Sequence, residues 1–452
     1  MRIKDLHFLL WLFACMLILS ACSKSDELNP DPSPDPNEIP QPPQAGSTAN
    51  RTVLIYMAAD SNLGQNGFAS NDLQEISEAI RTMDKNLYTR NNLLIYYDQY
   101  SETQTPILFR YVKAGELRTS DTDPSKQEMV VTAKQEIIKN FGVEMVSTNP
   151  SVIQEVMDLA FGTYPANSYA FVYWSHGDGW LPGMTGMSQS IAALRSRSPI
   201  RWIGVDQNNN SSNTSNASKT GIPELAEVLK KAPKKLDFIM FDACFMMSIE
   251  AAYELRNCAN YMIASPTETP GPGGPYTQLV PSMFSSDAAK QIADTYFKFY
   301  DNKYNPDVTN SNSNWTGGVS MTVLDLSKLE VLAMATKNAL SDTKIDNSDL
   351  RQNVFDYDKR NSTSHVGYYD MQGLMEKILY PEGYLDWLSA YQSALTYWKT
   401  TPKNYSQVVR LFSMTDTHGV AHYIPTSIGS TKDEDYRFTS WYKAAGLSKI
   451  GW

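Results

Sequence analysis

The sequence predicts an α/β protein, with a mostly parallel sheet flanked by helices and a helical C-terminal subdomain. Three observations lead to this prediction. Strand-like and helix-like segments alternate from residue 51 onward. The strand-like runs, such as YAFVYW at 169–174 and LDFIMF at 236–241, are continuously apolar, which is typical of strands buried on both faces. Residues that commonly cap helices stand where helices are expected to begin.

The expected elements follow one another along the chain. They are a strand at 52–59, a helix at 71–83, strands at 92–99 and 169–174 separated by a helix at 150–164, a helix at 222–232, and strands at 236–241 and 260–266. Asn71 or Asp72 is expected to cap the first helix, and Asn149 or Ser151 the second.

The amino-terminal segment has the composition of a secretion signal. Arg2 and Lys4 precede an apolar run that is too short for a confident membrane span. This run ends in LSAC, which resembles a bacterial lipoprotein box and implies that Cys22 is lipidated and anchors the chain to a membrane. The next residues, SKSDE at 23–27, resemble the export tag of lipoproteins in Bacteroides-like bacteria. A cell-envelope lipoprotein at the outer membrane or on the cell surface is therefore expected.

Composition divides the chain into four parts. These are a signal peptide at 1–22, a Pro-rich linker at 23–50, an α/β core at 51–327, and a C-terminal helical region at 328–452 with a returning core strand. Two later apolar runs, GVSMTVLDL at 318–326 and GVAHYIP at 419–425, are expected to extend the core sheet.

Charge and motifs exclude several classes of function. The formal net charge is −10, and loss of residues 1–22 would remove two basic side chains and one acidic one, giving −11. A chain this acidic is not expected to bind nucleic acid nonspecifically. The sequence also lacks a His/Cys cluster with zinc spacing, a GxxxxGK[ST] loop and a dinucleotide fingerprint, so nucleotide chemistry has no support.

Two of the apolar runs lead directly into residues capable of chemistry. His176 follows the run at 169–174, and Cys244 follows the run at 236–241. Because ligands bind outside the carboxyl ends of parallel strands, neighbouring strands would bring both side chains to one rim. Cys244 is expected to open a helix whose dipole favours the thiolate, with His176 accepting the proton. This arrangement indicates a cysteine nucleophile and its base. The alternatives are an inert buried cysteine and a histidine satisfied in a turn.

Four segments resemble one known family. SHGDGW around His176, DAC around Cys244, YMAADSNLGQNGFASNDLQEI at 56–76 and ASPTETPGPGGPY at 264–276 are similar to the clostripain family of cysteine peptidases. The resemblance implies a caspase-like fold and a His176/Cys244 dyad that cleaves peptide or protein substrates. It also implies an oxyanion site made by the backbone N–H groups of Gly177 and Cys244. No third catalytic residue and no cofactor is required, and calcium is left open.

The resemblance further implies a pocket for Arg or Lys before the cleaved bond, with Asp242 as its carboxylate. The chain departs from the family pattern at PGPGGPY, where Pro272 and Gly274 replace an acidic residue and a tryptophan; Glu268 could substitute. Some members of the family are activated by cleavage between the histidine and the cysteine. The basic side chains that suit such processing here are Arg195, Arg197 and Arg201.

Two other functions remain open from the sequence. The first is a noncatalytic surface lipoprotein that binds protein or glycan through its aromatic C-terminal half. The second is a related caspase-like peptidase with non-basic specificity, cutting after Asn or Asp.

Overall fold

The computed structural model describes residues 39–101, 103–122, 125–179, 202–207, 217–308, 315–359, 367–406, 409–426 and 436–452. The chain divides into two units, Met1–Ile39 and Pro40–Trp452. All the elements discussed below belong to the second unit.

A central sheet organises the second unit. Within the described residues it has nine strands, in the order β12-β10-β9-β8-β5-β1-β2-β3-β4. Their bounds are β1 Ala49–Ala59, β2 Asn91–Gln99, β3 Ile107–Thr119, β4 Gln127–Asn140, β5 Ala166–Trp174, β8 Leu236–Asp242, β9 Ala259–Ala264, β10 Ser320–Asp325 and β12 Leu395–Thr400. The five strands from β9 to β2 are parallel, and the strands added at either end are antiparallel. The predicted mostly parallel α/β sheet is confirmed.

The central strands contain continuous apolar runs because both faces of the sheet are covered. In β1, Leu54 and Tyr56 belong to one buried cluster, whereas Val53 and Ile55 belong to the other. Such alternation into two cores is the reason that these runs show no polar face.

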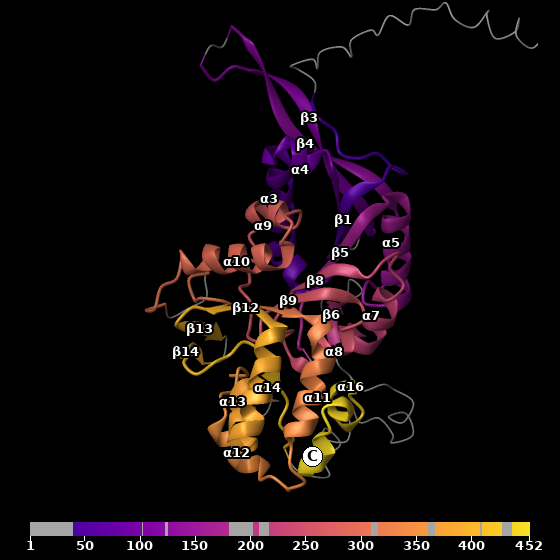
Figure 1. The fold of residues 1–452 in the computed structure, drawn as a ribbon. Helices are drawn as coiled ribbons and strands as arrows, with labels where there is room; N and C mark the ends of the chain where they lie inside the picture. Colours follow the sequence, from indigo (N-terminus) through magenta and orange to yellow (C-terminus); the bar gives the residue numbers. More distant parts are fainter. Residues whose placement is uncertain are drawn as a thin grey trace, which may run out of the picture. The chain divides into compact units, whose positions relative to one another are not determined.

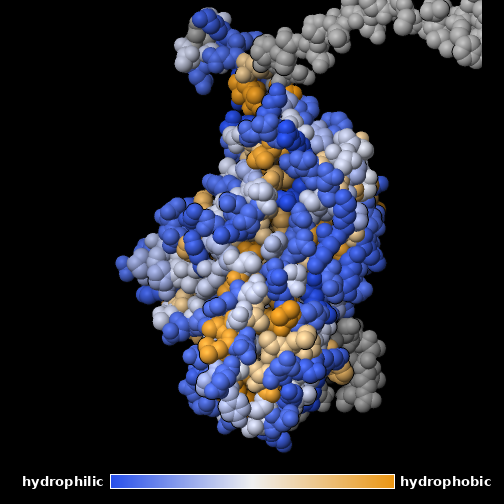
Figure 2. Space-filling view, viewed as in Figure 1, coloured by the Kyte–Doolittle hydropathy of each residue, from blue (hydrophilic) through white to orange (hydrophobic). Residues whose placement is uncertain are grey.

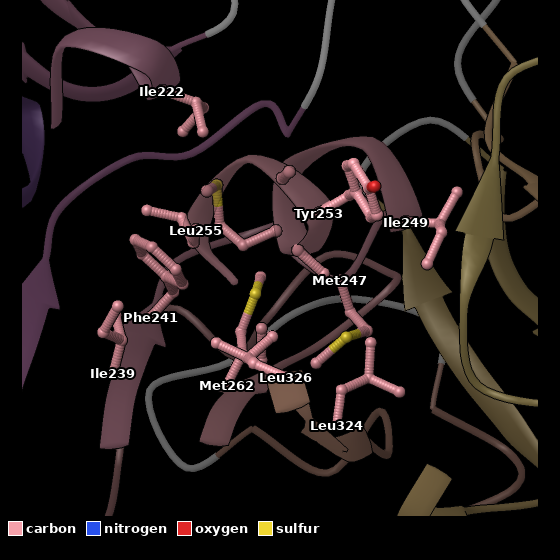
Figure 3. Close-up of a cluster of buried hydrophobic side chains, with 14 of the residues drawn as sticks. Ile222, Ile239, Phe241, Met247, Ile249, Tyr253, Leu255, Met262, Leu324 and Leu326 are labelled. Atoms are coloured by element: carbon pink, nitrogen blue, oxygen red, sulfur yellow. The ribbon is translucent and has the colours of Figure 1, made fainter. Parts of the chain in front are cut away.

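Helices cover each face of the sheet (Figure 1). One cluster contains side chains of α3 Phe68–Thr82, α9 Tyr276–Ser282 and α10 Ala288–Asp301. The other contains side chains of α5 Pro150–Thr163, α7 Ile222–Leu229, α8 Ile249–Leu255, α11 Leu329–Ala339, α13 Met371–Ile378, α14 Pro381–Ala394 and α16 Ser440–Ala444. Figure 3 shows part of this second core, where Leu255 of α8 lies near Phe241 of β8, and Met247 lies near Leu324 of β10.

The predicted helix caps are right in one case and wrong in the other. Asn149 caps α5, and its side-chain oxygen accepts a hydrogen bond from the Ser151 N–H at 3.0 Å. The helix that was expected to begin at Asn71 or Asp72 begins earlier, at Phe68, after Gly67 in a left-handed conformation (φ 80°). Asp72 therefore lies inside α3, where it is buried.

A long hairpin of β3 and β4 extends one end of the sheet, and no element was predicted there. The two strands pair from Ile107 with Asn140 out to Thr119 with Gln127. Leu117 and Met129 face each other across this pair and are 63% and 54% exposed. Hydrophobic residues are visible on the hairpin in Figure 2. The mixture of exposed polar and apolar residues gives these strands neither of the patterns used to recognise the buried ones.

Two apolar runs in the C-terminal part were expected to extend the central sheet, and one of them does so. GVSMTVLDL forms β10 as predicted. The prediction that GVAHYIP extends the sheet is wrong, because its β15 (Ala421–His422) pairs with β11 (Tyr369–Asp370) in a separate two-stranded sheet. The strand that returns is β12, which lies in the stretch expected to be helical within the C-terminal region.

We predict that Arg51 is a stabilising link between β1, β8 and α9. Its guanidinium donates to Asp237 Oδ2 at 2.7 Å and to the Met283 carbonyl at 2.6 Å, and its side chain is only 14% exposed. Arg51→Met should lower the free energy of unfolding by about 1–3 kcal/mol, because hydrogen bonds to a charged group are lost.

The measurement is the thermal midpoint, followed by circular dichroism. Arg81→Met is the matched control, since Arg81 pairs with Glu78 on the exposed side of α3. The control should leave the midpoint unchanged. Equal midpoints for Arg51→Met and wild type would show that the link does not stabilise the fold.

Candidate active site

A cavity of about 910 Å³ opens at the carboxyl ends of β5 and β8. The register of these strands pairs Trp174 with Asp242, so the residues two positions further on, His176 and Cys244, leave the sheet together. Both side chains line the cavity, with Asp242 and Glu268. The structure thus brings the predicted candidates to one place.

His176 is held by a residue that the sequence did not single out. Its Nε2 lies 2.7 Å from Asn62 Oδ1, in the short helix α2 (Asn62–Gln65) that follows β1. An amide oxygen can only accept, so Nε2 carries the proton and Nδ1 is left as the basic nitrogen. Asn62 lies within the YMAADSNLGQNGFASNDLQEI segment. Because it is 114 residues from His176 along the chain, no local sequence pattern indicates this contact.

Cys244 is partly buried and hydrogen-bonded to the loop after β9. Its Sγ accepts a hydrogen bond from the Thr269 N–H at 3.3 Å and lies 3.5 Å from Thr269 Oγ1. Among the hydrogen bonds of the described residues, none joins His176 to Cys244. Such contacts are often long in enzymes without substrate.

The expectation that Cys244 opens a helix is wrong. Helix α8 begins at Ile249, and its cap is Ser248, so the thiol precedes the first helical residue by a whole turn or more. A helix dipole acts within its first turn and cannot favour the thiolate from there.

A tight turn replaces the helix at the nucleophile. Phe245 has a φ of 58°, a left-handed conformation that is uncommon for a bulky residue. Two backbone hydrogen bonds hold the turn, from the Phe245 N–H to the Thr267 carbonyl and from the Met247 N–H to the Ser265 carbonyl, both at 3.0 Å. The thiol is therefore presented by a fixed turn between β8 and α8.

The loops that carry His176 and Cys244 are in direct contact. A Cβ at Gly177 would lie 2.8 Å from the Cys244 carbonyl oxygen, which leaves no room for a side chain. Tyr368 joins the same two loops from the C-terminal part. Its ring stacks on Phe245 at 5.2 Å, and its hydroxyl donates to the Asp178 carbonyl.

Burial keeps both candidate catalytic groups neutral. It lowers the pKa of His176 to about 4, and the positive charge of Lys219 acts in the same direction. Burial also raises the pKa of the Cys244 thiol to about 11, with a further contribution from the Glu268 charge. The resting pair at neutral pH is thus a thiol and an imidazole, rather than the preformed thiolate expected from the sequence.

Asp242 ends β8 at the wall of the cavity and is buried. Its Oδ2 accepts hydrogen bonds from the Gly274 N–H at 2.8 Å and the Tyr276 hydroxyl at 3.1 Å, and its Oδ1 accepts one from the Tyr296 hydroxyl at 3.1 Å. Burial raises its pKa, and these hydrogen bonds oppose the rise.

Glu268 also lines the cavity, close enough to influence the thiol. Its Oε1 accepts a hydrogen bond at 2.9 Å from Ser406 of β13 (Lys403–Ser406). Cys22, Arg195, Arg197 and Arg201 lie outside the described residues.

The described residues contain no group of three or more His, Cys, Asp or Glu side chains arranged to hold a metal ion. None of the helices that the structure describes has both the length and the apolarity needed to cross a membrane.

This fold and site define a class. A mostly parallel sheet, with a thiol and an imidazole leaving adjacent strands into one cavity, is the arrangement of caspase-like cysteine peptidases. Within that class the chain belongs to the clostripain family, whose family model matches residues 55–427.

Solved structures agree with this assignment. A secreted C11 cysteine protease from Bacteroides thetaiotaomicron, in complex with an irreversible peptide inhibitor, is 36% identical with a TM-score of 0.71. An inactive zymogen C11 protease from Parabacteroides distasonis is 27% identical with a TM-score of 0.65. Each similarity covers 88% of this chain and 99% of the other. The predicted family, the caspase-like fold and the class of cysteine peptidase are confirmed.

Clostripain from Hathewaya histolytica is 24% identical over 277 residues, which are 57% of this chain and 48% of clostripain. This chain therefore matches about half the length of that relative.

We predict that alkylation of Cys244 by iodoacetamide accelerates steeply with pH. Only the thiolate reacts, and with a thiol pKa of about 11 its fraction rises about tenfold per pH unit between pH 7 and 10. The measurement is the rate of mass increase at each pH, with the labelled peptide identified and Cys244→Ala as the control. A rate that levels off below pH 8 would show instead a stabilised thiolate.

Proposed function

We propose that this protein is a cysteine endopeptidase in which Cys244 is the nucleophile and His176 the proton carrier. The observation that supports this best is their shared cavity, with the His176 ring fixed by Asn62. The alternative of a noncatalytic surface lipoprotein is less well supported. A cysteine with a purely structural role would not require an imidazole fixed in the same cavity.

The chemistry begins from a neutral pair. As the thiol sulfur forms a bond to the substrate carbonyl carbon, its proton passes to the free nitrogen of His176. The imidazolium then gives this proton to the leaving amine, and a thioester remains on Cys244. Water, deprotonated by the same imidazole, attacks the thioester, releases the acid product and returns the proton to sulfur.

Backbone amides are the proposed partners of the oxyanion. Gly177 and Cys244 belong to the two loops that touch each other, so their N–H groups can be aimed at one oxygen. The Asn62 side chain is a positioning group, since it contacts the imidazole and not the reacting atoms.

For substrate choice we propose Arg or Lys before the cleaved bond. Asp242 supports this preference, because it is a buried carboxylate at the wall of the cavity that holds the nucleophile. Glu268 adds a second negative charge near the thiol. One of its carboxylate oxygens, Oε1, also accepts a hydrogen bond from the Ser406 hydroxyl.

We also propose activation by cleavage near Arg195, Arg197 and Arg201. The described chain on either side of this segment supports the idea, because Asp178 and Trp202 both line the catalytic cavity. A relative from Parabacteroides distasonis is described as an inactive zymogen. The signal sequence and LSAC motif further support attachment to the cell envelope through lipidated Cys22.

Peptidase activity is tested with a mixed peptide library and the purified chain from residue 23 onward. Wild type should cut after Arg or Lys, and Cys244→Ala should show no cleavage above background, because the nucleophile is absent. Mass spectrometry reads both the products and the enzyme's own mass. Cleavage by Cys244→Ala would contradict the proposed nucleophile, and a fully active intact chain would contradict processing.

The role of Asn62 predicts a particular kinetic signature. Asn62→Ala should lower kcat about 10- to 100-fold with little change in KM, because the imidazole loses its orientation but no substrate contact is removed. Asn62→Asp keeps an acceptor for Nε2–H and should recover part of the rate. An equal loss in both variants would indicate a general structural role instead.

A further inference from the structure

A second carboxylate lies buried behind Asp242. Asp72 of α3 is 1% exposed, and its Oδ2 accepts a hydrogen bond from the Trp174 indole N–H at 2.6 Å. Trp174 is the last residue of β5 and lines the catalytic cavity. Asp72 is thus attached to the wall of the active site from the side of the sheet that α3 covers.

Asp72 and Asp242 approach one point of the backbone. A Cβ at Gly273 would lie 2.8 Å from Asp72 Oδ2 and 3.3 Å from Asp242 Oδ2. Gly273 has a φ of +74° and itself lines the cavity. A side chain at this position would collide with Asp72 and press on Asp242, so only glycine fits here. Gly273 and Asp242 line the catalytic cavity, and Asp72 lies behind them.

In the described part of the chain, no Lys, Arg or His forms an ion pair with either aspartate. The titratable groups around the pair are Glu75 and the phenols of Tyr276, Tyr296 and Tyr300. Lys303 lines a cavity with Asp72, and its charge acts on Glu75. Burial first, and then the charge of Asp242, raises the pKa of Asp72 well above its usual value.

Two buried carboxylates without a cation are costly unless one holds a proton or a cation enters from outside. Asp72 lines a smaller neighbouring cavity with Glu75 and Lys303, whereas Asp242 lines the catalytic cavity, where a substrate side chain would lie. A guanidinium or ammonium group is suited to this position, since it can satisfy a carboxylate by charge and by hydrogen bonds.

We propose that Asp72 is a specificity-determining residue that acts with Asp242 to select a cationic side chain before the cleaved bond. Asp242 contacts the cation, and Asp72 supplies the second negative charge from behind Gly273. It thereby replaces the acidic residue that the loop at 270–276 lacks. This inference rests on the proposed function and names a residue that the sequence assigned only to a helix cap.

The test uses two fluorogenic peptides that differ only in arginine or citrulline before the cleaved bond, because citrulline has nearly the shape of arginine without its charge. Wild type should prefer arginine. In Asp72→Asn, kcat/KM for the arginine peptide should fall about tenfold or more, whereas the citrulline peptide should change far less. Asp158→Asn, an exposed substitution on α5, controls for net charge and should keep the wild-type ratio.

The Trp174→Phe variant distinguishes the effect of the Asp72 charge from the effect of its hydrogen bond to Trp174. It removes the hydrogen bond to Asp72 but leaves the carboxylate, so the preference for arginine over citrulline should persist. If Asp72→Asn keeps the wild-type ratio, the inference is wrong although the proposed specificity stands. If wild type itself does not distinguish the two peptides, the proposed basic specificity fails.

Wild type alone supplies a further measurement should Asp72→Asn not fold. Raised carboxyl pKa values mean that the pair becomes fully ionised only as pH rises, and the ionised pair binds a cation better. KM for the arginine peptide should therefore fall with increasing pH, while KM for the citrulline peptide should not. Parallel pH dependence for both peptides would overturn the inference.

Discussion

The parallel pairing of β5 with β8 is the constraint on which the active site depends. It aligns Trp174 with Asp242, and it therefore fixes the level at which His176 and Cys244 leave the sheet. The apolar side chains on both faces of these strands hold this register, because a slip by one residue would exchange the two buried faces. Packing of the core therefore determines the relative positions of His176 and Cys244.

Burial that stabilises the sheet also sets the protonation of the site. Burial favours the neutral forms of His176 and Cys244, so in the proposed mechanism the ion pair forms only as the substrate is attacked. Asp72 and Asp242 are also buried, and burial raises the pKa of both carboxyl groups. Burial thus affects both the candidate catalytic pair and the carboxyl groups beside it.

The sequence predicts the parts of this site that follow from local pattern. Continuous apolar runs locate the buried strands, and the polar residues at their ends identify His176 and Cys244. Contacts over long distances leave no such pattern, so Asn62, Tyr368 and the inward direction of Asp72 emerge only from the fold. The start of α8 was predicted too early because the apolar residues Met246 and Met247 continue the helical pattern into a turn that is held by hydrogen bonds to the loop after β9.

The order of strands divides the sheet into two blocks. β1 to β5 all lie on one side of the boundary between β5 and β8, and β8, β9, β10 and β12 all lie on the other. The imidazole belongs to the earlier block and the thiol to the later one. If the chain were cut between these blocks, the β5–β8 pairing would join the two polypeptides, and the proposed catalytic pair would exist only at their junction.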